Sequence, residues 1–248
     1  MTLEQFFAEN REVAIAFSGG VDSAYLLYAA TRYAARVKAY YVSTAFQPEF
    51  ELADARRLAD ELGADMLVLH VDVLSNSAVT ANPSDRCYHC KNTLFRQILR
   101  AAENDGFPVL LDGTNASDDA GDRPGMRALR ELSVRSPLRE YGLTKAEIRR
   151  LSREAGLFTW DKPAYACLAT RIRTGEEITL QKLKQTEKAE GFLFGLGFRD
   201  FRVRMVGNTA KLELREADLP LLLENREKIV TELRKDYDSV LLNLEVRK

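Results

Sequence analysis

The sequence predicts an α/β protein, in which a parallel sheet carries helices on both faces and a small α+β domain follows. Two observations predict this arrangement. Short apolar segments alternate with helix-like segments through the first part of the 248-residue chain. Near residue 172 the pattern changes to a helix, a hairpin, a second helix and a last strand. We therefore predict a larger domain of residues 1–171 and a smaller one of residues 172–248.

Four strands are expected in the larger domain, at EVAIAF, VKAYYVST, ADMLVLHVDV and PVLLDGTN. Short apolar runs bounded by turns are typical of buried parallel strands. Helices are expected at about residues 23–35, 49–63, 90–103 and 144–156. The last of these begins with a capping box, in which Glu147 follows Thr144 by three positions, and it ends at Gly156. Residues 159–175 show little periodicity and are expected to form a loop.

The smaller domain is expected to contain a hairpin between two helices, at about residues 179–194 and 217–237, before a final strand VLLNLEV. The two-residue turn Gly207–Asn208 fixes the register of the hairpin. Strand alternation then gives one polar face, which carries Arg202, Arg204, Lys211, Glu213 and Arg215. Such a face either binds a nucleotide phosphate or is solvated, with a cross-strand pair of about 0.2–1 kcal/mol between Arg202 and Glu213.

The composition argues against several classes of protein. The 36 Lys and Arg residues balance 37 Asp and Glu residues, which gives no support for nucleic-acid binding. No apolar run is long enough to span a bilayer, and MTLEQFFAENREV lacks the pattern of a signal peptide. We expect a cytoplasmic protein that binds neither nucleic acid nor a membrane. Its three cysteines, Cys87, Cys90 and Cys167, favour a metal site or reactive thiols over disulfides.

A phosphate-binding loop is expected directly after the first strand. There the chain passes into a helix through Ser18, Gly19, Gly20, Val21, Asp22 and Ser23. N–H groups at a helix start lack partners and carry partial positive charge, and glycine lets the backbone approach an oxyanion closely. The Asp22 carboxylate would be out of place beside an anion unless it binds a cation or orients the hydrogen-bond donors of the loop. The loop contains no lysine, and other common phosphate-binding motifs are absent after this strand.

The segment SGGVDS, together with GTN at residues 113–115, resembles the PP-loop of the ATP pyrophosphatase superfamily. The resemblance covers about residues 11–170. It implies that Ser18–Ser23, Gly113 and Asn115 bind ATP, and that Mg²⁺ neutralises part of the phosphate charge. It also implies that a substrate oxygen attacks the α-phosphorus and releases pyrophosphate.

Three further segments, NPSDRCYHCK, GTNASDDAGDRPGMRALRE and DKPAYACLATRI, narrow the resemblance to the LarE family over essentially the whole chain. It implies that pyridinium-3,5-dicarboxylic acid mononucleotide is adenylated and converted to a thiocarboxylate, for the nickel-pincer cofactor of lactate racemase. It also implies that Arg202 and Arg204 line the active site, where we expect them to bind the substrate phosphate. Arg171 either binds phosphate or supports its loop, and Glu187 is a weaker candidate to join Glu213 around a divalent cation. LarE relatives form homo-oligomers, and we expect one here.

The source of the sulfur has two possible answers within this resemblance. In some LarE proteins the cysteine at the position of Cys167 gives up its own sulfur. In others, three cysteines hold a [4Fe–4S] cluster. We predict a cluster at Cys87, Cys90 and Cys167, in which one iron lacks a protein ligand and can bind sulfide. The alternatives for the first two cysteines are a zinc site that includes His89, or no function beyond a helix start.

Two other functions stay open. One is a tRNA-thiolating PP-loop enzyme, because some of these also place three cysteines around a cluster. Such an enzyme is expected to carry a basic appendage or an RNA-binding module, and this sequence shows neither. The other is a nucleotide-binding module without catalysis, against which the intact loop argues. The contribution of the acidic residues after GTN, Asp118, Asp119 and Asp122, is left open.

Overall fold

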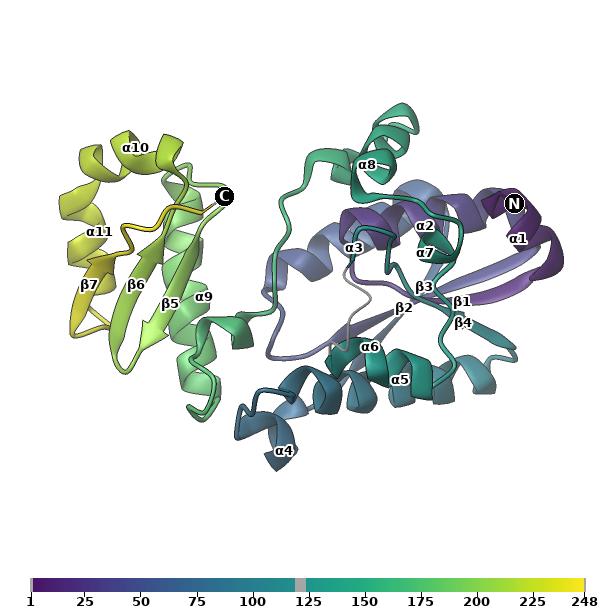
Figure 1. Cartoon of the computed structure of the whole chain (residues 1–248), viewed down its shortest axis with the longest axis horizontal. Helices are drawn as coiled ribbons and strands as arrows, with labels where there is room; N and C mark the ends of the chain where they lie inside the picture. The colour runs from purple at the N-terminus through teal and green to yellow at the C-terminus, as the bar shows by residue number, and fades with distance from the viewer. Residues whose placement is uncertain (1, 119–123, 248) are drawn as a thin grey trace. The chain divides into compact units, whose positions relative to one another are not determined.

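The computed structural model describes residues 2–118 and 124–247, and it divides the chain into two units (Figure 1). The N-terminal unit consists of Met1–Val73 and Asp85–Lys162. The C-terminal unit consists of Leu74–Ser84 and Pro163–Lys248. The division after Lys162 lies earlier than the boundary predicted after residue 171, and the loop that contains Cys167 therefore belongs to the C-terminal unit.

The N-terminal unit is built on a four-stranded sheet in the order β3-β2-β1-β4, in which all neighbouring strands are parallel. Its strands are β1 (Glu12–Ala16), β2 (Arg36–Ser43), β3 (Asp65–His70) and β4 (Val109–Leu111). Its helices are α1 (Leu3–Glu9), α2 (Val21–Tyr33), α3 (Glu49–Leu62), α5 (Arg86–Asn104), α6 (Pro124–Glu131), α7 (Pro137–Glu140) and α8 (Lys145–Glu154). The predicted fold class is confirmed.

Helices cover both faces of this sheet (Figure 1), and the alternation along β1 shows how. Val13 and Ile15 pack into a core with residues of α1, α2 and α3. Ala14 points to the opposite face, where it packs with Tyr40 and with Ile98 of α5. The three consecutive β1 residues are fully buried. Burial on both faces explains why this strand appears in the sequence as a continuous apolar run.

Two helices of the N-terminal unit begin earlier than predicted. α2 begins at Val21 instead of Ser23, and α5 begins at Arg86 instead of Cys90. The shift places Asp22 in the first turn of α2, and both Cys87 and Cys90 in the first turns of α5. The side chains of these three residues are thus held by regular helical backbone.

The C-terminal unit contains a second sheet in the order β5-β6-β7. Its strands are β5 (Arg202–Val206), β6 (Thr209–Glu213) and β7 (Ser239–Leu242), and its helices are α4 (Ser77–Thr80), α9 (Leu180–Gly195), α10 (Leu219–Glu224) and α11 (Arg226–Leu233). The predicted hairpin register is confirmed, since Arg202 pairs with Glu213 and Arg204 with Lys211. The single helix predicted at 217–237 is wrong, because Asn225 separates α10 from α11 and donates its side-chain amide to the Leu221 carbonyl at 3.1 Å.

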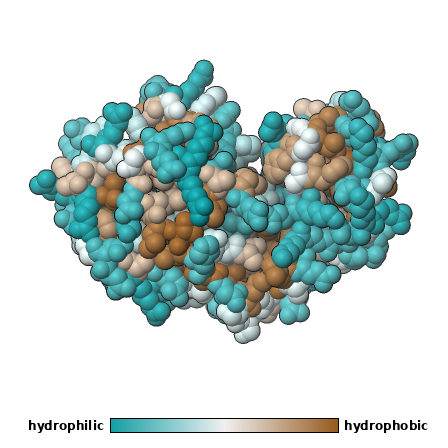
Figure 2. All heavy atoms as spheres, turned by 180° about the vertical axis from the view of Figure 1, so that it is seen from behind, coloured by the Kyte–Doolittle hydropathy of each residue, from teal (hydrophilic) through white to brown (hydrophobic). Residues whose placement is uncertain are grey.

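Hydrophilic side chains dominate the surface seen in Figure 2, and hydrophobic side chains form patches between them. In the described ranges, no helix combines the length and apolar character that crossing a bilayer requires.

Candidate active site

The predicted phosphate-binding loop connects β1 to α2, and its serine side chains make hydrogen bonds within the loop. The hydroxyl oxygens of Ser18 and Ser23 are 3.0 Å apart, and the Ser23 hydroxyl donates to the Gly20 carbonyl at 3.2 Å. Gly19 has a φ of 71° and packs on α3, where an added Cβ would lie 3.2 Å from the Ala55 Cβ. No side chain caps the start of α2 in the described structure. The first N–H groups of this helix are therefore available to an anion.

The turn after β4 packs against the same loop. An added Cβ at Gly113 would lie only 2.8 Å from the backbone nitrogen of Ser23, so this close approach requires glycine. Asn115 is buried, and its side-chain oxygen accepts a hydrogen bond from the Ser117 N–H at 2.8 Å. The Asp118 carboxylate accepts from the Asn115 N–H at 2.9 Å and so stabilises this turn. The two predicted nucleotide-binding segments are thus brought together, whereas Asp119 and Asp122 lie outside the described residues.

Asp22 presents one paired and one unpaired carboxylate oxygen. Its Oδ2 accepts a hydrogen bond from the Lys145 ammonium at 2.6 Å. Its Oδ1 is buried and has no hydrogen-bond partner in the described structure. Burial raises the pKa of Asp22, and this effect outweighs the opposing influence of Lys145. Carboxylate oxygens are the ligands that Mg²⁺ prefers, together with phosphate oxygens. The Asp22 side chain therefore fits the predicted Mg²⁺, which Asp22 would hold beside the phosphates of ATP.

Two lysines outside the loop sequence reach the loop through the fold. Lys145 is the first residue of α8, and its ammonium reaches Asp22. The Lys162 ammonium lies 2.7 Å from a carboxylate oxygen of Asp54 and 3.4 Å from the Gly19 carbonyl oxygen. Neither lysine was among the predicted site residues, because the loop itself contains no lysine. The helix-start signal at Thr144 was the only available indication for Lys145, and no local pattern pointed to Lys162.

In the C-terminal unit, the loop around Cys167 is fixed by Glu190 of α9. The Tyr165 hydroxyl donates to Glu190, and Arg171 donates to both oxygens of this carboxylate, at 2.7 and 3.0 Å. The Val203 N–H donates to it as well, at 2.9 Å. The side chains of Arg171 and Glu190 are 0% and 1% exposed. Glu190 therefore orients the chain on both sides of Cys167.

Arg171 is fully engaged by these and two further contacts. Its remaining nitrogen, Nη1, donates to the Ala166 carbonyl at 3.0 Å and to the Thr170 hydroxyl at 2.8 Å. Of its two expected roles, supporting the loop fits these contacts. Glu190 was not among the predicted site residues, although its position in line with Leu183 and Leu193 on the buried face of α9 was an available signal.

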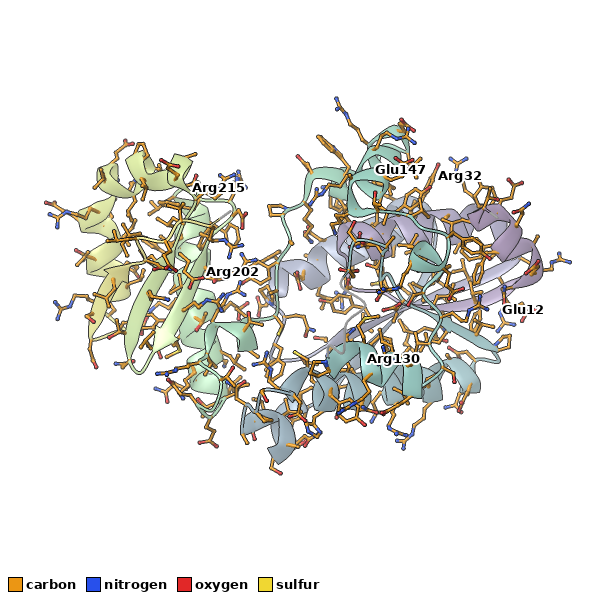
Figure 3. All side chains as sticks on the ribbon, in the orientation of Figure 1. Glu12, Arg32, Arg130, Glu147, Arg202 and Arg215 are labelled. Carbon is orange, nitrogen blue, oxygen red and sulfur yellow. The ribbon has the colours of Figure 1, made fainter. Side chains whose placement is uncertain are left out.

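The two arginines of the hairpin have different environments. Arg202 is 6% exposed, and its guanidinium donates to the carbonyls of Phe201 and Ala164, both at 2.6 Å (Figure 3). Burial lowers the pKa of Arg202. The Arg204 side chain is 37% exposed and donates to Glu213 at 2.8 Å and to the Thr170 carbonyl at 2.5 Å. Arg202 shares a strand face with Arg204, as the register predicts, but the Ala164 carbonyl, from the segment before Cys167, covers its guanidinium.

Glu213 binds the cations of the hairpin, although not the expected one. It pairs with Arg204 and, at 3.3 Å, with Lys211, and the described residues contain no ion pair between Glu213 and Arg202. Burial raises the pKa of Glu213, but its contacts with Arg204 and Lys211 overcome this effect and the pKa is lowered. Glu213 therefore stays ionised beside two cations.

A pocket of about 350 Å³ lies beside this hairpin, within the C-terminal unit. Its cationic lining consists of Arg173, Arg204 and Lys211, with the buried Arg171 behind them, and Thr170 and Thr174 add hydroxyl groups. Arg173 was not among the predicted site residues, because it lies outside the hairpin in the preceding loop. The pocket can accept a phosphate group through charge-assisted hydrogen bonds.

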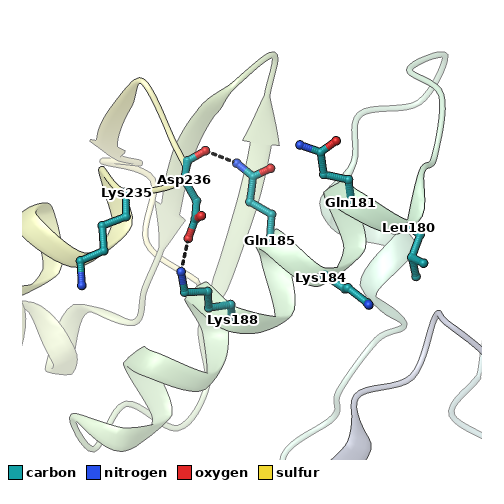
Figure 4. A pocket seen from close by; sticks show the side chains of 7 residues that line it. All are labelled: Leu180, Gln181, Lys184, Gln185, Lys188, Lys235 and Asp236. Atoms are coloured by element: carbon teal, nitrogen blue, oxygen red, sulfur yellow. Dashed lines mark hydrogen bonds and ion pairs between the residues drawn. The ribbon is translucent and has the colours of Figure 1, made fainter.

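A larger pocket of about 620 Å³ lies between α9 and the segment after α11 that contains Lys235 and Asp236 (Figure 4). The Lys188 ammonium points to the Asp236 carboxylate at 2.6 Å, and the Gln185 amide donates to the Asp236 carbonyl at 2.5 Å. Lys235 is paired with Glu232. Because no predicted site residue lines it, this pocket is a weaker candidate for phosphate.

None of the three cysteines forms a disulfide in the described residues. Cys87 is exposed and lies 3.9 Å from the Arg86 guanidinium, measured from sulfur to Nη2. Cys90 lies on the same helix, and Cys167 belongs to the C-terminal unit. His89 is 3.4 Å from the Asp85 carboxylate. The C-x-x-C spacing thus places Cys87 and Cys90 within one turn of the same helix, in the N-terminal unit.

None of the predicted metal sites, including that of Mg²⁺ at Asp22, is confirmed in the described residues. Residues 2–118 and 124–247 contain no group of three or more His, Cys, Asp or Glu side chains arranged to hold a metal ion. This finding applies to the predicted [4Fe–4S] cluster, to the zinc alternative with His89, and to a divalent cation at Glu187 and Glu213. These sites are not confirmed.

Comparison with known proteins covers both units. Residues 4–122 match the family model described as asparagine synthase. The chain is 40% identical to an uncharacterized protein of Synechocystis sp., over 86% of this chain and 80% of that protein. It is 32% identical to the pyridinium-3,5-bisthiocarboxylic acid mononucleotide synthase of Lactiplantibacillus plantarum, over 94% of this chain and 85% of the synthase. It is also 26% identical to the tRNA-specific 2-thiouridylase MnmA of Thermotoga petrophila, but only over 59% of this chain and 52% of MnmA.

Proposed function

The chain belongs to the LarE family of ATP-dependent sulfurtransferases, and we propose that it converts carboxylates of pyridinium-3,5-dicarboxylic acid mononucleotide to thiocarboxylates. The observation that carries this proposal is the similarity to the Lactiplantibacillus plantarum synthase over 94% of the chain, which includes both the phosphate-binding loop and the basic pocket. The product would serve the nickel-pincer cofactor of lactate racemase.

The first step is adenylation at the loop between β1 and α2. The pyrophosphate part of ATP binds to the uncapped start of α2, where the helix dipole and free N–H groups stabilise the charge of the leaving group. A carboxylate oxygen of the substrate attacks the α-phosphorus, and pyrophosphate leaves. Lys145 and Lys162 add positive charge beside the loop. Mg²⁺, when bound at Asp22, neutralises part of the phosphate charge.

Adenylation makes the next step possible. A carboxylate oxygen is a poor leaving group, whereas AMP is a good one. A sulfur nucleophile therefore displaces AMP from the acyl-adenylate and leaves a thiocarboxylate or thioester.

The phosphate of the mononucleotide binds in the basic pocket of the C-terminal unit. Arg204, which was predicted for this role, would act with Arg173 and Lys211, since all three line that pocket. Arg171 also lines the pocket and is held in place by its bonds to Glu190, whereas Arg202 donates to the Phe201 and Ala164 carbonyls, which lie outside the lining. A phosphate would compete with Glu213 for Arg204 and Lys211.

Cys87, Cys90 and Cys167 would hold a [4Fe–4S] cluster, which would supply the sulfur. Two features support this part of the proposal: none of the three cysteines forms a disulfide in the described residues, and the first two have the C-x-x-C spacing at the start of α5. The competing source is Cys167 itself. Anaerobic reconstitution with iron and sulfide, followed by electron paramagnetic resonance of the reduced protein, should give a cluster signal that each single Cys→Ala variant loses. No signal, together with mass loss at Cys167 in step with product, would instead make Cys167 the donor.

We also propose that the enzyme is a homo-oligomer that associates through its C-terminal unit. Among the exposed leucines of this unit, Leu223, Leu241 and Leu244 are 71%, 54% and 87% exposed. Apolar side chains that form a contiguous exposed patch are typical of contact surfaces. Light scattering of the purified chain tests this.

Pyrophosphate release in the presence of two possible substrates tests the function as a whole. The pyridinium mononucleotide should stimulate release from ATP, and mass spectrometry should detect its thiocarboxylate. The partial similarity to MnmA makes unmodified tRNA the second candidate substrate. Stimulation by tRNA and not by the mononucleotide would replace the proposed function with tRNA thiolation.

A further inference from the structure

We propose that Lys162 couples nucleotide binding at the phosphate loop to the segment that carries Cys167. Lys162 is the last residue of the N-terminal unit, and Pro163 begins the C-terminal unit. Cys167 follows five positions after Lys162. The chain therefore leaves the nucleotide-binding unit at the residue whose ammonium contacts the phosphate loop. This inference rests on ATP binding at that loop and not on the identity of the sulfur acceptor.

The Lys162 side chain is held against the loop by two groups. Its ammonium lies 2.7 Å from Asp54 Oδ2 and 3.4 Å from the Gly19 carbonyl oxygen. The side chain is only 15% exposed, so its charge is largely removed from solvent. Asp54 and Ala55 are neighbours on α3, and Ala55 is the residue on which Gly19 packs. Lys162, α3 and the phosphate loop thus form one contact region.

An ammonium group has three N–H donors, and the two oxygens account for two of them. A phosphate oxygen at the loop can accept the third. Phosphate competes well for such a donor, because hydrogen bonds between an ammonium and an oxyanion are shorter and stronger than those to a carbonyl. Bound ATP would therefore hold Lys162 more firmly than the empty loop does.

Hydrogen bonds also fix the backbone of residues 160–162. A change at the Lys162 ammonium can therefore be transmitted to the segment that follows. Arg149 of α8 donates to the Trp160 carbonyl at 2.6 Å and to the Lys162 carbonyl at 2.8 Å. The backbone before Pro163 is therefore fixed on one side by α8, and the Lys162 side chain fixes it on the other. Lys162 is a positioning residue in this scheme, since it acts on the Cys167 segment through the chain.

Hydrogen–deuterium exchange of the full-length protein tests the coupling. The probe is α,β-methylene-ATP with Mg²⁺, in which a methylene group replaces the oxygen that leaves during adenylation. In the wild type, the probe should slow exchange in residues 18–27, which contain the loop, and also in residues 160–170. In Lys162→Met the protection of 18–27 should persist at saturating probe, and the protection of 160–170 should be lost. Lys162→Arg should restore it.

Two control variants separate coupling from structural support. Asp54→Asn removes the carboxylate but keeps the ammonium, so protection of 160–170 should remain. Lys188→Met removes an ion pair of similar length, 2.6 Å to Asp236, away from the loop, and should change neither segment. Persistent protection of 160–170 in Lys162→Met would overturn the proposal. Loss of protection in both segments, or equal losses in Lys162→Met and Asp54→Asn, would overturn it as well.

Turnover provides an independent measurement. In Lys162→Met, the thiocarboxylate formed for each pyrophosphate released should fall about tenfold, as expected for loss of one charge-assisted contact. An unchanged ratio would count against the coupling. If the wild type releases no pyrophosphate with the mononucleotide, the proposed substrate is wrong, and the exchange result still tests the coupling.

Discussion

Replacement of Glu190 by glutamine should strongly destabilise the C-terminal unit. The Glu190 carboxylate accepts four hydrogen bonds: two from Arg171, one from Tyr165 and one from Val203. Glutamine has nearly the same shape, but its NH₂ group would face the donors that now meet one carboxylate oxygen. Its neutral side chain would also leave the buried Arg171 charge uncompensated.

The magnitude follows from the burial of the pair. The Arg171 and Glu190 side chains are 0% and 1% exposed, so water cannot replace the lost contacts. Breaking a buried ion pair by removing one charge typically costs about 3–5 kcal/mol. A matched control is Glu213→Gln, because the partner of Glu213, Arg204, is 37% exposed and remains solvated. Such a partly exposed pair contributes about 0–1 kcal/mol.

Urea unfolding, followed by circular dichroism, measures this difference. The only tryptophan, Trp160, lies in the N-terminal unit, so its fluorescence reports on the unfolding of that unit. The urea midpoint measured by fluorescence should therefore shift less than the midpoint measured by circular dichroism. The double variant Arg171→Met/Glu190→Gln should recover part of the loss, because no unpaired buried charge remains. A Glu190→Gln variant as stable as Glu213→Gln would refute this account of the Cys167 loop.

Three other predictions concern the nucleotide and substrate sites. Asp22→Asn should abolish pyrophosphate release and yet stabilise the free protein at neutral pH. The pKa of Asp22 is raised above its ordinary value of 3.8. The stability of the wild type therefore falls as the pH rises from about 3.8 to the raised pKa, and the variant avoids this loss. Melting temperatures of the wild type and of Asp22→Asn, measured from pH 3 to pH 7, check this. A difference between the two that narrows toward neutral pH would contradict it. Gly113→Ala should weaken ATP binding and cost about 1–3 kcal/mol, because its Cβ would meet the Ser23 backbone; unchanged calorimetric affinity would disprove it. Arg204→Ala and Arg173→Ala should raise the KM for the mononucleotide about tenfold or more with little effect on that for ATP, and equal effects on both would return these residues to a solvated surface.

The features that could be predicted from the sequence are those set by local backbone geometry. Gly19 and Gly113 occur where the backbone bends sharply or approaches another segment, and they mark the loop and the turn directly. The Gly207–Asn208 turn gave the register of the hairpin, which the structure confirms. In each case a few consecutive residues determine the conformation, so a short motif contains the necessary information.

The features that could not be predicted depend on which segments meet in the folded chain. The hairpin register placed Arg202 on a polar face, but the covering carbonyl comes from Ala164, far away in the sequence. The helix expected at 217–237 is interrupted because Asn225 bonds back to the Leu221 carbonyl, which competes with helix continuation. Neither partner can be identified from the periodicity of one segment.

The pairing of charges around the proposed phosphate sites follows from the same tertiary contacts and has a consequence for binding. Four cations at these sites contact carboxylates, in the pairs Lys145–Asp22, Lys162–Asp54, Arg204–Glu213 and Lys211–Glu213. The Lys162 side chain is only 15% exposed, and a largely buried cation without a partner is costly, so Asp54 stabilises the free protein. All three carboxylates would repel an incoming phosphate. Binding therefore requires each cation to exchange or share its partner, which favours ligands with several negative charges, such as ATP with Mg²⁺ and a nucleotide phosphate, over singly charged analogues.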